Sequence, residues 1–428
     1  MKNYVKVAAL LGMSVATLNA AGYKIPEQSL DALALSAAYV ANARGADASY
    51  YNPANMAFSR AGAQMEIGLT YINLPKIKYS DINPTYSGNS KIENFLVPTF
   101  HYMSPEVNRW RFGLSLTAPG GLSKRWDSTY PKTFAQEFTL KIFELNPTAS
   151  YKVNDKFAVG FGARGVYTDG TVRSDGIVPA DLNQDGTIDS KVNIKRDMTG
   201  DSIDFGYNLA LSYRPIKEMT LSATYRSKVD LSVKGDAQLS NTIISSPYAV
   251  AGTVLGYYNG DASVTIPLPA TLDLATAYTF NKTTIELVYE RVYWSSYKNL
   301  DFNYNTNLSG NPALAVFDNP IPKNWKDTNA YRIGITHQYS DKLKLMAGFA
   351  IDESPVPSNT LGFELPDSDA KLYSLGFEYK VSKSTSFGLA YLYDSKDTRT
   401  ISANEGHVNG TFKDISAHLV TASIKYRF

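Results

Sequence analysis

The sequence contains no cysteine among its 428 residues, and tryptophan, with four residues, is scarce. A disulfide framework is therefore excluded, and stability has to come from packing and from backbone hydrogen bonds. The charges nearly cancel, at a formal net charge of +2, so the composition gives no support for a nucleic-acid partner. The four histidines form no motif with serine and aspartate, which argues against a hydrolase site.

Long apolar runs are also missing. Beyond the N-terminus, no run of about 18 apolar residues appears, which excludes a transmembrane helix. Residues 1–20 have the order of a secretory signal peptide: Lys2 and Lys6, then "VAALLGMSVA", then a cleavage site ending at Ala20. A membrane anchor is the alternative, but the apolar stretch is too short to span a bilayer. We expect an exported chain that is either soluble or a membrane β-barrel.

Strand-like alternation is what the sequence has in abundance. In "LVTASIKYRF", at residues 419–428, apolar and polar side chains take turns, and "KFAVGFGARGVY" and "SIDFGYNLALSY" repeat the pattern. One face is apolar and aromatic, whereas the other holds glycine, serine, alanine and charge. This pattern is typical of a barrel with lipid outside and a polar lumen. A soluble sandwich would instead turn its apolar face inward to a core.

The predicted connections alternate between short and long. Short ones such as "SPEVNR" and "YSDK" separate long ones at about 75–91, 119–136, 169–201, 236–261, 303–327, 353–370 and 395–411. Outer-membrane barrels have short periplasmic turns and longer outer loops. We therefore predict an all-β fold, a transmembrane antiparallel β-barrel of about 14 strands over residues 63–428, with both termini on the periplasmic side.

Residues 21–62 do not alternate. The stretch contains helical segments that break at Asn52 and Pro53. A segment of this size at the periplasmic entry predicts a plug, or hatch, inside the lumen; an ordinary periplasmic tail is the alternative. We expect Asn52, Pro53 and Ala54 to form a tight turn in which the Asn52 side chain bonds local backbone and fixes the plug against the wall.

Several stretches follow one another in a specific order along the chain. They include "GADASYYNPANMAF", "FGLSLTAPGGLSKRWD", "LNPTASYKVNDKFAVGFGARGVY", "LPATLDLATAY" and "IDESPVPSN". Together they resemble the FadL/TodX-like outer-membrane transporters of long-chain fatty acids and other hydrophobic compounds. The resemblance implies a barrel occluded by an N-terminal hatch, ligand capture from outside, and release sideways into the membrane. It also implies passive uptake, with no enzyme chemistry and no required cofactor.

The predicted outer loop at 236–261 is rich in apolar residues for a segment that faces water. Exposed apolar surface usually marks a contact site, so we expect a hydrophobic substrate to dock there. The docking residues are Ile243, Ile244, Tyr248, Val250, Val254, Leu255, Tyr257 and Tyr258. Packing of the loop against its neighbours is the alternative, and "NPALAVF" at 311–317 is a second candidate.

The stretch "LTAPGGLS" lies where the third strand is expected to leave the wall. Pro119 cannot donate to a strand ladder, and Gly120 and Gly121 tolerate the geometry of a β-bulge. We predict an inward kink here that forms a lateral opening, as the resemblance also implies. A plain strand end is the alternative.

Four cations face the lumen in the predicted register: Arg164, Arg226, Arg332 and Lys344. They are natural partners for the carboxylate of a fatty acid. The alternative is that they pair with acids on the same face, such as Glu286, Glu290 and Glu378.

The predicted outer loop "DLNQDGTID" has the spacing of a calcium loop. Asp181, Asn183, Asp185 and Asp189 can offer hard oxygen ligands to one cation, although the final glutamate of an EF-hand is missing. We therefore predict a structural calcium ion, with a solvated acidic turn as the alternative.

The sequence favours passive uptake of long-chain fatty acids or other hydrophobic compounds through the outer membrane of a Gram-negative bacterium. Aromatic hydrocarbons are the alternative substrates. An adhesin or receptor barrel without transport would need polar loops, and a general porin would need an open lumen. The expected partners are the hydrophobic solute, outer-membrane lipids and lipopolysaccharide, and we expect a monomer.

Overall fold

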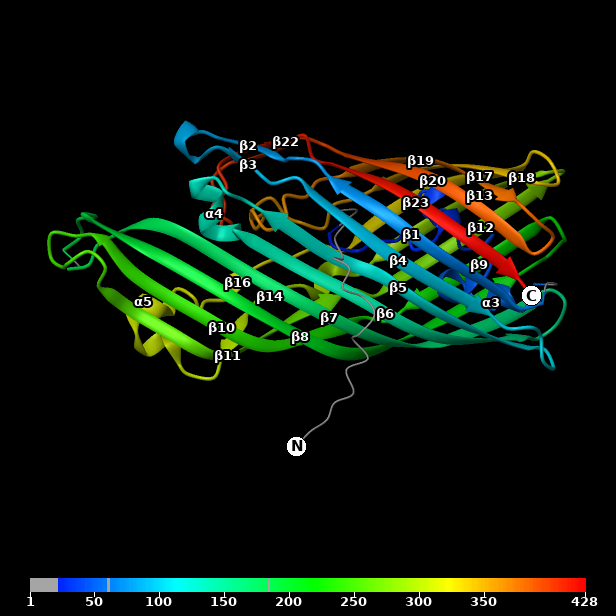
Figure 1. The fold of residues 1–428 in the computed structure, drawn as a ribbon, viewed down its shortest axis with the longest axis horizontal. Helices are drawn as coiled ribbons and strands as arrows, with labels where there is room; N and C mark the ends of the chain where they lie inside the picture. The colour runs from blue at the N-terminus through cyan, green and yellow to red at the C-terminus, as the bar shows by residue number, and fades with distance from the viewer. Residues whose placement is uncertain (1–21, 60–61, 184) are drawn as a thin grey trace.

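The computed structural model describes residues 22–59, 62–183 and 185–428. The predicted signal peptide at residues 1–20 lies outside the described residues. Most of the described chain forms one antiparallel sheet, in which the first wall strand, β1 (Gln64–Leu74), pairs with the last, β23 (Ser416–Arg427). The result is a closed barrel of 14 strands, which confirms the predicted fold class (Figure 1).

The wall strands follow one another in chain order. After β1 come β4 (Glu93–Met103), β5 (Trp110–Arg125), β6 (Glu137–Lys152), β7 (Phe157–Ala180) and β8 (Ser190–Tyr213). Two wall strands are broken in the middle, β9 (Met219–Arg226) continuing as β10 (Val229–Ser245), and β11 (Val254–Leu268) continuing as β12 (Thr271–Phe280). The rest are β13 (Thr283–Val292), β17 (Thr328–Gln338), β18 (Leu343–Asp352), β19 (Ala370–Lys380) and β20 (Thr385–Lys396).

Side chains along the wall alternate between the outside and the lumen. On β8, Phe205 and Leu209 are exposed on the outer face, whereas Asn208 and Ser212 are buried on the inner face. This is the division that the sequence pattern predicted, since lipid requires apolar side chains and the lumen tolerates polar ones. Within the described residues, no helix combines the length and the apolarity needed to cross a bilayer.

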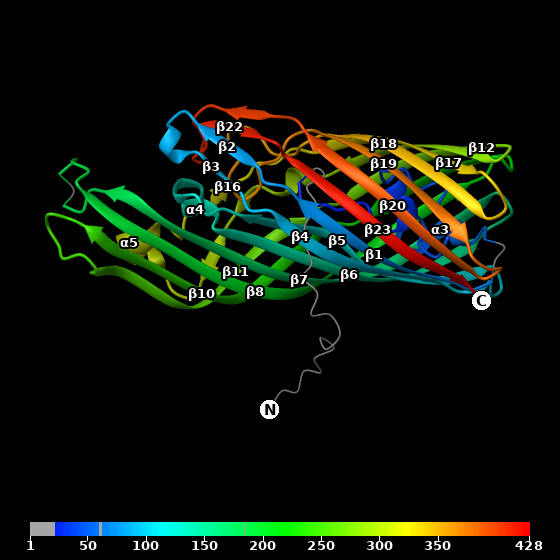
Figure 2. The same ribbon diagram turned by 45° about the horizontal axis from the view of Figure 1, so that its top comes forward.

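The two ends of the barrel differ. At the end that holds the C-terminus, the strands are joined by turns of a few residues, whereas the opposite end carries longer connections with small elements (Figures 1 and 2). The small elements of this end are β2 (Lys78–Asp81), η1 (Pro84–Tyr86), β3 (Gly88–Asn89), α4 (Thr129–Ala135), η2 (Trp294–Ser296), β14 (Asn299–Leu300), β15 (Phe302–Tyr304), η3 (Leu308–Gly310), α5 (Pro312–Ala315), β16 (Ile321–Pro322), β21 (Arg399–Ile401) and β22 (Gly410–Lys413).

Two predicted outer loops are largely strands, and those predictions were wrong. The pairing of β7 with β8 continues without a break to Ala180 and Ser190, and β10 pairs with β11 over most of 236–261. These four strands extend past the rest of the barrel (Figures 1 and 2). Strands that pair with one another satisfy their backbone groups in water as well as in lipid, so pairing need not stop at the membrane boundary.

Residues 22–59, called the plug below, lie inside the barrel. They contain α1 (Leu30–Ala34), α2 (Ala48–Tyr51) and α3 (Pro53–Met56), and almost all of their side chains are buried. Helix α1 contacts β18, β19, β20 and β23, whereas α3 contacts β5 to β8 on the opposite side of the lumen. The plug therefore spans the lumen from wall to wall.

Two wall glycines let the plug approach closely. A Cβ atom added at Gly348 would lie 2.1 Å from the backbone of Leu35, and one at Gly160 would lie 2.4 Å from the backbone of Ala54. Real Cβ contacts are never that short, and backbone cannot yield as a flexible side chain can. At these two glycines the main chain of the plug therefore packs directly against the main chain of the wall.

We expect Gly348→Val to displace the plug and to raise the ion conductance of the purified protein in planar bilayers about tenfold, since the side chain has no room beside Leu35. Gly310→Val is the control, because a Cβ there meets nothing within 4 Å. Heat-modifiable migration on gels checks that the barrel has folded. A folded Gly348→Val barrel with the conductance of the unaltered protein would contradict this packing.

Candidate functional site

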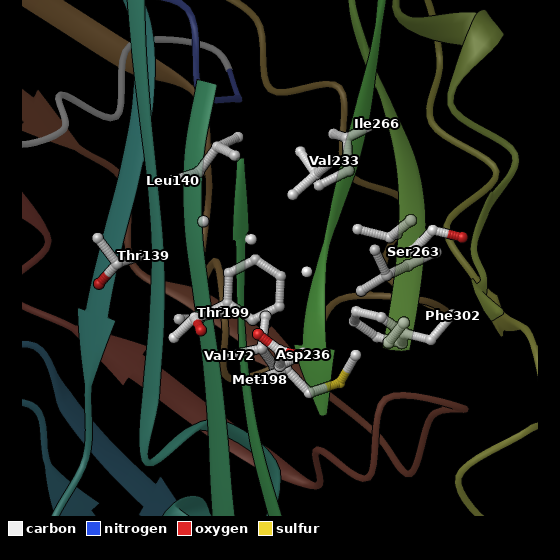
Figure 3. A pocket seen from close by; sticks show the side chains of 17 residues that line it. Thr139, Leu140, Val172, Met198, Thr199, Val233, Asp236, Ser263, Ile266 and Phe302 are labelled. Carbon is white, nitrogen blue, oxygen red and sulfur yellow. The ribbon is translucent and has the colours of Figure 1, made fainter. Parts of the chain in front are cut away.

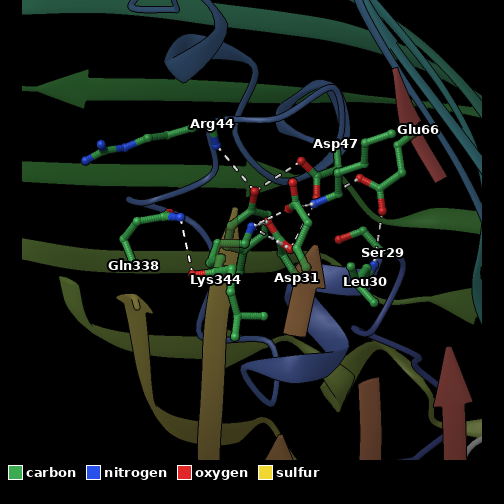
Figure 4. Close-up of polar contacts among 12 residues, drawn as sticks. Ser29, Leu30, Asp31, Arg44, Asp47, Glu66, Gln338 and Lys344 are labelled. Atoms are coloured by element: carbon green, nitrogen blue, oxygen red, sulfur yellow. Dashed lines mark hydrogen bonds and ion pairs between the residues drawn. The ribbon is translucent and has the colours of Figure 1, made fainter. Parts of the chain in front are cut away.

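An ion cluster ties the plug to the wall near the end with short turns (Figure 4). Asp31, on α1, lies 2.8 Å from the ammonium of Lys344 on β18 and 2.8 Å from that of Lys425 on β23. Glu378, on β19, contacts the same two lysines at 2.7 and 3.1 Å. Because a shift of α1 would separate Asp31 from both lysines, the cluster fixes the position of α1.

A second wall carboxylate holds the plug by its main chain. Glu286, on β13, accepts hydrogen bonds from the backbone N–H groups of Val40, Ala41 and Asn42 at 2.7, 2.6 and 3.1 Å. Hydrogen bonds to a charged acceptor are among the strong ones, so three of them can satisfy a buried carboxylate without a cation. Glu286 therefore acts as a clamp on the segment between α1 and α2.

The four lumen cations predicted from the register all have carboxylate partners. Arg164 Nε lies 2.8 Å from Glu144 Oε2, and a guanidinium nitrogen of Arg332 lies 2.8 Å from Glu290. The pairs are Arg164–Glu144, Arg226–Glu144, Arg332–Glu290 and Lys344–Asp31. A ligand carboxylate would have to compete with these acids for the cations, and the role of the cations in ligand binding stays a prediction.

The contacts of Asn52 differ from those predicted. Its side-chain amide does not bond neighbouring backbone; Nδ2 donates to Val40 O at 3.0 Å and to Ser212 Oγ, on β8, at 2.9 Å. Pro53 is the first residue of α3. An N–H group at this position would have no acceptor within the helix, so proline costs no hydrogen bond here. The backbone does turn here, since the N–H of Asn55 donates to Asn52 O at 3.0 Å. Only the predicted local bond of the Asn52 side chain was wrong, because the amide finds partners across the plug and on the wall.

Strand β5 carries a bulge at the predicted kink. Its register with β6 shifts between Thr117 and Gly120. Within the described residues, β5 pairs with β4 only over residues 113–116, so residues 93–99 of β4 have no β5 partner. Proline and paired glycines allow this departure from the wall, and it leaves a break in the ladder between β4 and β5.

The plug pairs with the part of β5 that has left the wall. The N–H of Ile25 donates to Pro119 O at 2.9 Å, and the N–H of Gly121 donates to Tyr23 O at 2.8 Å. Residues 23–25 thus act as a short strand on the inner side of β5, with Lys24 bridged to Gly120. The backbone groups freed by the bulge find partners in the plug.

Gln28 strengthens this contact. Its side-chain Oε1 accepts from the N–H of Ala118 at 2.7 Å, while its Nε2 donates to Ala118 O at 2.9 Å. Its own carbonyl lies 2.8 Å from Nε2 of His101 on β4. One plug residue therefore bonds both strands that border the break in the wall.

An apolar cavity lies on the inner face of β6, β7, β8, β10 and β11, toward the end with long connections. Side chains that line it include Leu140, Val233, Ile266 and Phe302 (Figure 3). Its free volume is about 40 Å³, so an alkyl chain can enter only if the lining side chains move apart.

A second apolar cavity adjoins the first, since Phe138, Leu140 and Ile266 line both. Its far side is formed by Tyr23 of the plug together with Trp325. Tyr23 is the residue whose carbonyl bonds Gly121 of the bulge, so the two cavities trace a line from the extended hairpins to the break in the wall.

Polar groups gather at this second cavity. Lys323, buried and paired with Glu364, lines it. Burial, with a further contribution from Glu364, raises the pKa of Tyr297 well above its ordinary range, so its hydroxyl stays neutral. Trp325, which also lines the cavity, is buried, and among the described residues its indole N–H has no hydrogen-bond acceptor. An unused donor beside a lysine suits an acceptor group on a ligand.

The apolar residues predicted to dock substrate lie on the β10–β11 hairpin and its connection. Tyr248 and Val250 do lie in a loop, whereas the prediction of a loop was wrong for the other six residues, which belong to β10 and β11. Ile243 and Tyr258 are buried, whereas Val250 and Tyr257 are 79 % and 61 % exposed. Helix α5, from the second predicted docking segment, packs on the hairpin through Leu314. The hairpin therefore keeps one apolar face in water, and docking on that face stays a prediction.

The predicted calcium loop forms turns through its own side chains. Asp181 Oδ2 accepts from the N–H of Gly186 at 2.8 Å, and Asp185 Oδ1 accepts from the N–H of Thr187 at 2.7 Å. Gln184 lies outside the described residues. In the part of the chain that the structure describes, no group of three or more histidine, aspartate or glutamate side chains is placed to hold a metal. Calcium binding stays a prediction.

We expect Asp31→Asn to loosen the plug, because α1 loses its ion pairs with Lys344 and Lys425; breaking a buried ion pair costs about 3–5 kcal/mol. Amide hydrogen exchange of residues 22–59 measures the effect and should accelerate, while exchange in the wall strands stays the same. Asp127→Asn is the control, since Asp127 forms an exposed ion pair with Lys91. Unaltered plug exchange in the Asp31 variant would show that the cluster does not anchor α1.

A family model described as "Outer membrane protein transport protein (OMPP1/FadL/TodX)" matches residues 12–428. The long-chain fatty acid transport protein of Escherichia coli (strain K12) is 26 % identical over 325 residues, which cover 68 % of this chain and 69 % of that protein. Outer membrane protein P1 of Haemophilus influenzae is 23 % identical over 387 residues, covering 81 % of this chain and 80 % of that protein.

Solved structures are similar over almost the whole chain. A Pseudomonas aeruginosa FadL homologue has a TM-score of 0.80 at 20 % identity and covers 95 % of this chain and 100 % of that chain. The Pseudomonas putida toluene transporter TodX has a TM-score of 0.70 at 19 % identity and covers 92 % and 98 %. The family consists of outer-membrane transport channels of Gram-negative bacteria and not of enzymes. With a family model matched over residues 12–428 and a closed barrel of that fold, the chain belongs to the OMPP1/FadL/TodX family of outer-membrane transport proteins.

Proposed function

We propose that this chain is a passive channel for long-chain fatty acids and similar amphiphiles. Apolar side chains of the extended hairpins collect the solute, the lumen holds it beside the plug, and it leaves sideways between β4 and β5. Moving an apolar chain from water to apolar surface gains about 25 cal/mol per Å² buried, so no energy source is needed for capture.

The observation that carries this proposal is the pair of adjoining apolar cavities. It begins at Phe302 and Val233 beside the extended hairpins and passes Leu140. It ends at Tyr23, which is bonded to the bulge. A pore for small hydrophilic solutes needs an open aqueous lumen, and the buried plug argues against that alternative.

Lys323 favours an amphiphile over a plain hydrocarbon. It is 3 % exposed and lies on an otherwise largely apolar cavity, next to the unused indole N–H of Trp325. A carboxylate that displaces Glu364 would gain a charge-assisted hydrogen bond, whereas toluene would gain none. The same aromatic side chains also suit an aromatic hydrocarbon, which remains the second candidate because one structural relative is a toluene transporter.

Sideways release avoids periplasmic water. The described wall lacks a ladder between residues 93–99 of β4 and strand β5, and the plug covers this break from inside. A shift of residues 23–28 would uncover the break toward the lipid. We infer that the barrel works as a monomer among outer-membrane lipids and lipopolysaccharide, since each chain carries its own plug and opening.

We expect the double variant Lys323→Met/Glu364→Gln to slow uptake of labelled oleate into liposomes about tenfold, because the ligand carboxylate loses its charged partner. The paired change leaves no buried charge without a counterion. Methyl oleate is the matched control and should enter at the rate seen with the unaltered protein. Equal loss of both solutes would contradict a role for Lys323 in head-group selection, and no oleate uptake by the unaltered protein would overturn the proposed function.

We expect Gly120→Leu to block release. A Cβ at this position would lie 2.9 Å from Tyr23 O and 3.1 Å from Ile142, so the larger side chain fills the bulge. Oleate should still bind the purified protein with similar affinity, but its transfer to liposome lipid should fall about tenfold. Gly310→Leu serves as the control. Normal transfer through a folded Gly120→Leu barrel would place the exit elsewhere.

A further inference from the structure

The barrel end with short turns opens into a polar cavity, called the vestibule below. Its free volume is about 760 Å³, much larger than that of the apolar cavities. Its inner end is the plug, through residues that include Asp31 and Arg44, and its sides are the ends of β1 and β23 and three short turns. Since short turns face the periplasm in outer-membrane barrels, a soluble periplasmic molecule can enter it.

Cations dominate the vestibule. Lys344 and Lys425 are neutralised by Asp31, Glu378 and Glu66. The other lining cations are Arg44, Lys282, Lys342, Lys380, Lys383 and Arg427. Within the described residues these six have no ion pair, and one further lining acid, Asp341, faces them. Figure 4 draws the side chain of Arg44 extending away from the ion cluster.

The positions of these cations indicate a partner with several negative charges. They come from the plug, from the turns β12–β13, β17–β18 and β19–β20, and from the end of β23, so they are spread over several elements of the vestibule. Six cations that form no ion pair among the described residues, carried by separate elements, suit a partner with several negative charges. Like charges gathered around a concave surface repel one another and focus a positive potential, which attracts a complementary anion.

We propose that the vestibule is a docking site for an acidic peptide segment of a periplasmic protein. An extended segment is narrow enough to enter a cavity of this size, and successive carboxylates can reach cations on separate turns. Bilayer lipids are a weaker match, because the cations line the cavity inside the wall and not its outer face. The docked segment would lie against the plug, beside the lysines that hold Asp31. This proposal does not depend on the solute that the channel carries.

The test uses the full-length protein in nanodiscs of zwitterionic lipid and a fluorescent decaglutamate peptide, with decalysine as the charge control. Fluorescence anisotropy should show that decaglutamate binds and decalysine does not, and that binding weakens strongly at about 0.5 M NaCl. Lys342→Glu/Lys383→Glu should weaken binding at least about tenfold, since it reverses two vestibule charges.

The matched control is Lys156→Glu/Lys217→Glu. These lysines are exposed on other short turns at the same end of the barrel and do not line the vestibule. Their reversal should change the affinity less than about twofold. Equal losses in both double variants would show that decaglutamate senses net charge alone, and that result would overturn the proposal. Loss of peptide binding when phosphatidylglycerol is added to the nanodisc would also overturn it, because the occupant would then be an anionic lipid.

Discussion

The structure depends on one constraint: in lipid, every backbone N–H and C=O must have a partner within the protein. Closure of β1 on β23 meets this constraint around the barrel. The ladder is interrupted where β5 bulges and leaves β4. There the plug supplies the partners, through Tyr23 and Ile25 on one side and through Gln28 on the bulge itself. The same contact between the plug and β5 therefore closes the break in the wall and holds the plug in the lumen. If the plug moves, β5 loses these partners.

The ion pairs between the plug and the wall determine the position of the plug more than they stabilise the folded protein. Replacing a buried ion pair by apolar side chains is often neutral or stabilising, so the many pairs between plug and wall are weak evidence for a tight structure. They do exclude alternative placements, because a shifted plug would leave Asp31 or Glu286 without partners in the lumen. The plug therefore has one well-defined position, and leaving that position breaks these contacts.

The sequence predicted the features that follow from local pattern. Alternating apolar and polar residues predicted the wall strands, and the absence of this alternation in residues 21–62 predicted the plug. Proline followed by two glycines predicted the bulge in β5. The length of β7, β8, β10 and β11 was not predicted, because outside the membrane no lipid face distinguishes strand from loop. The contacts of Lys323 were also missed. The groups around it come from distant parts of the chain, as Tyr23 and Trp325 show, and no spacing in the sequence records that they meet.

The clamp formed by Glu286 has an evolutionary consequence. It grips three consecutive main-chain amides and contacts none of their side chains through these bonds. Substitutions at residues 40–42 that keep the backbone path therefore leave the attachment intact. Related proteins can therefore differ in the side chains on the plug surface, and so in the shape of the lumen that a solute occupies. The hydrogen bonds that attach the plug to β13 can stay the same.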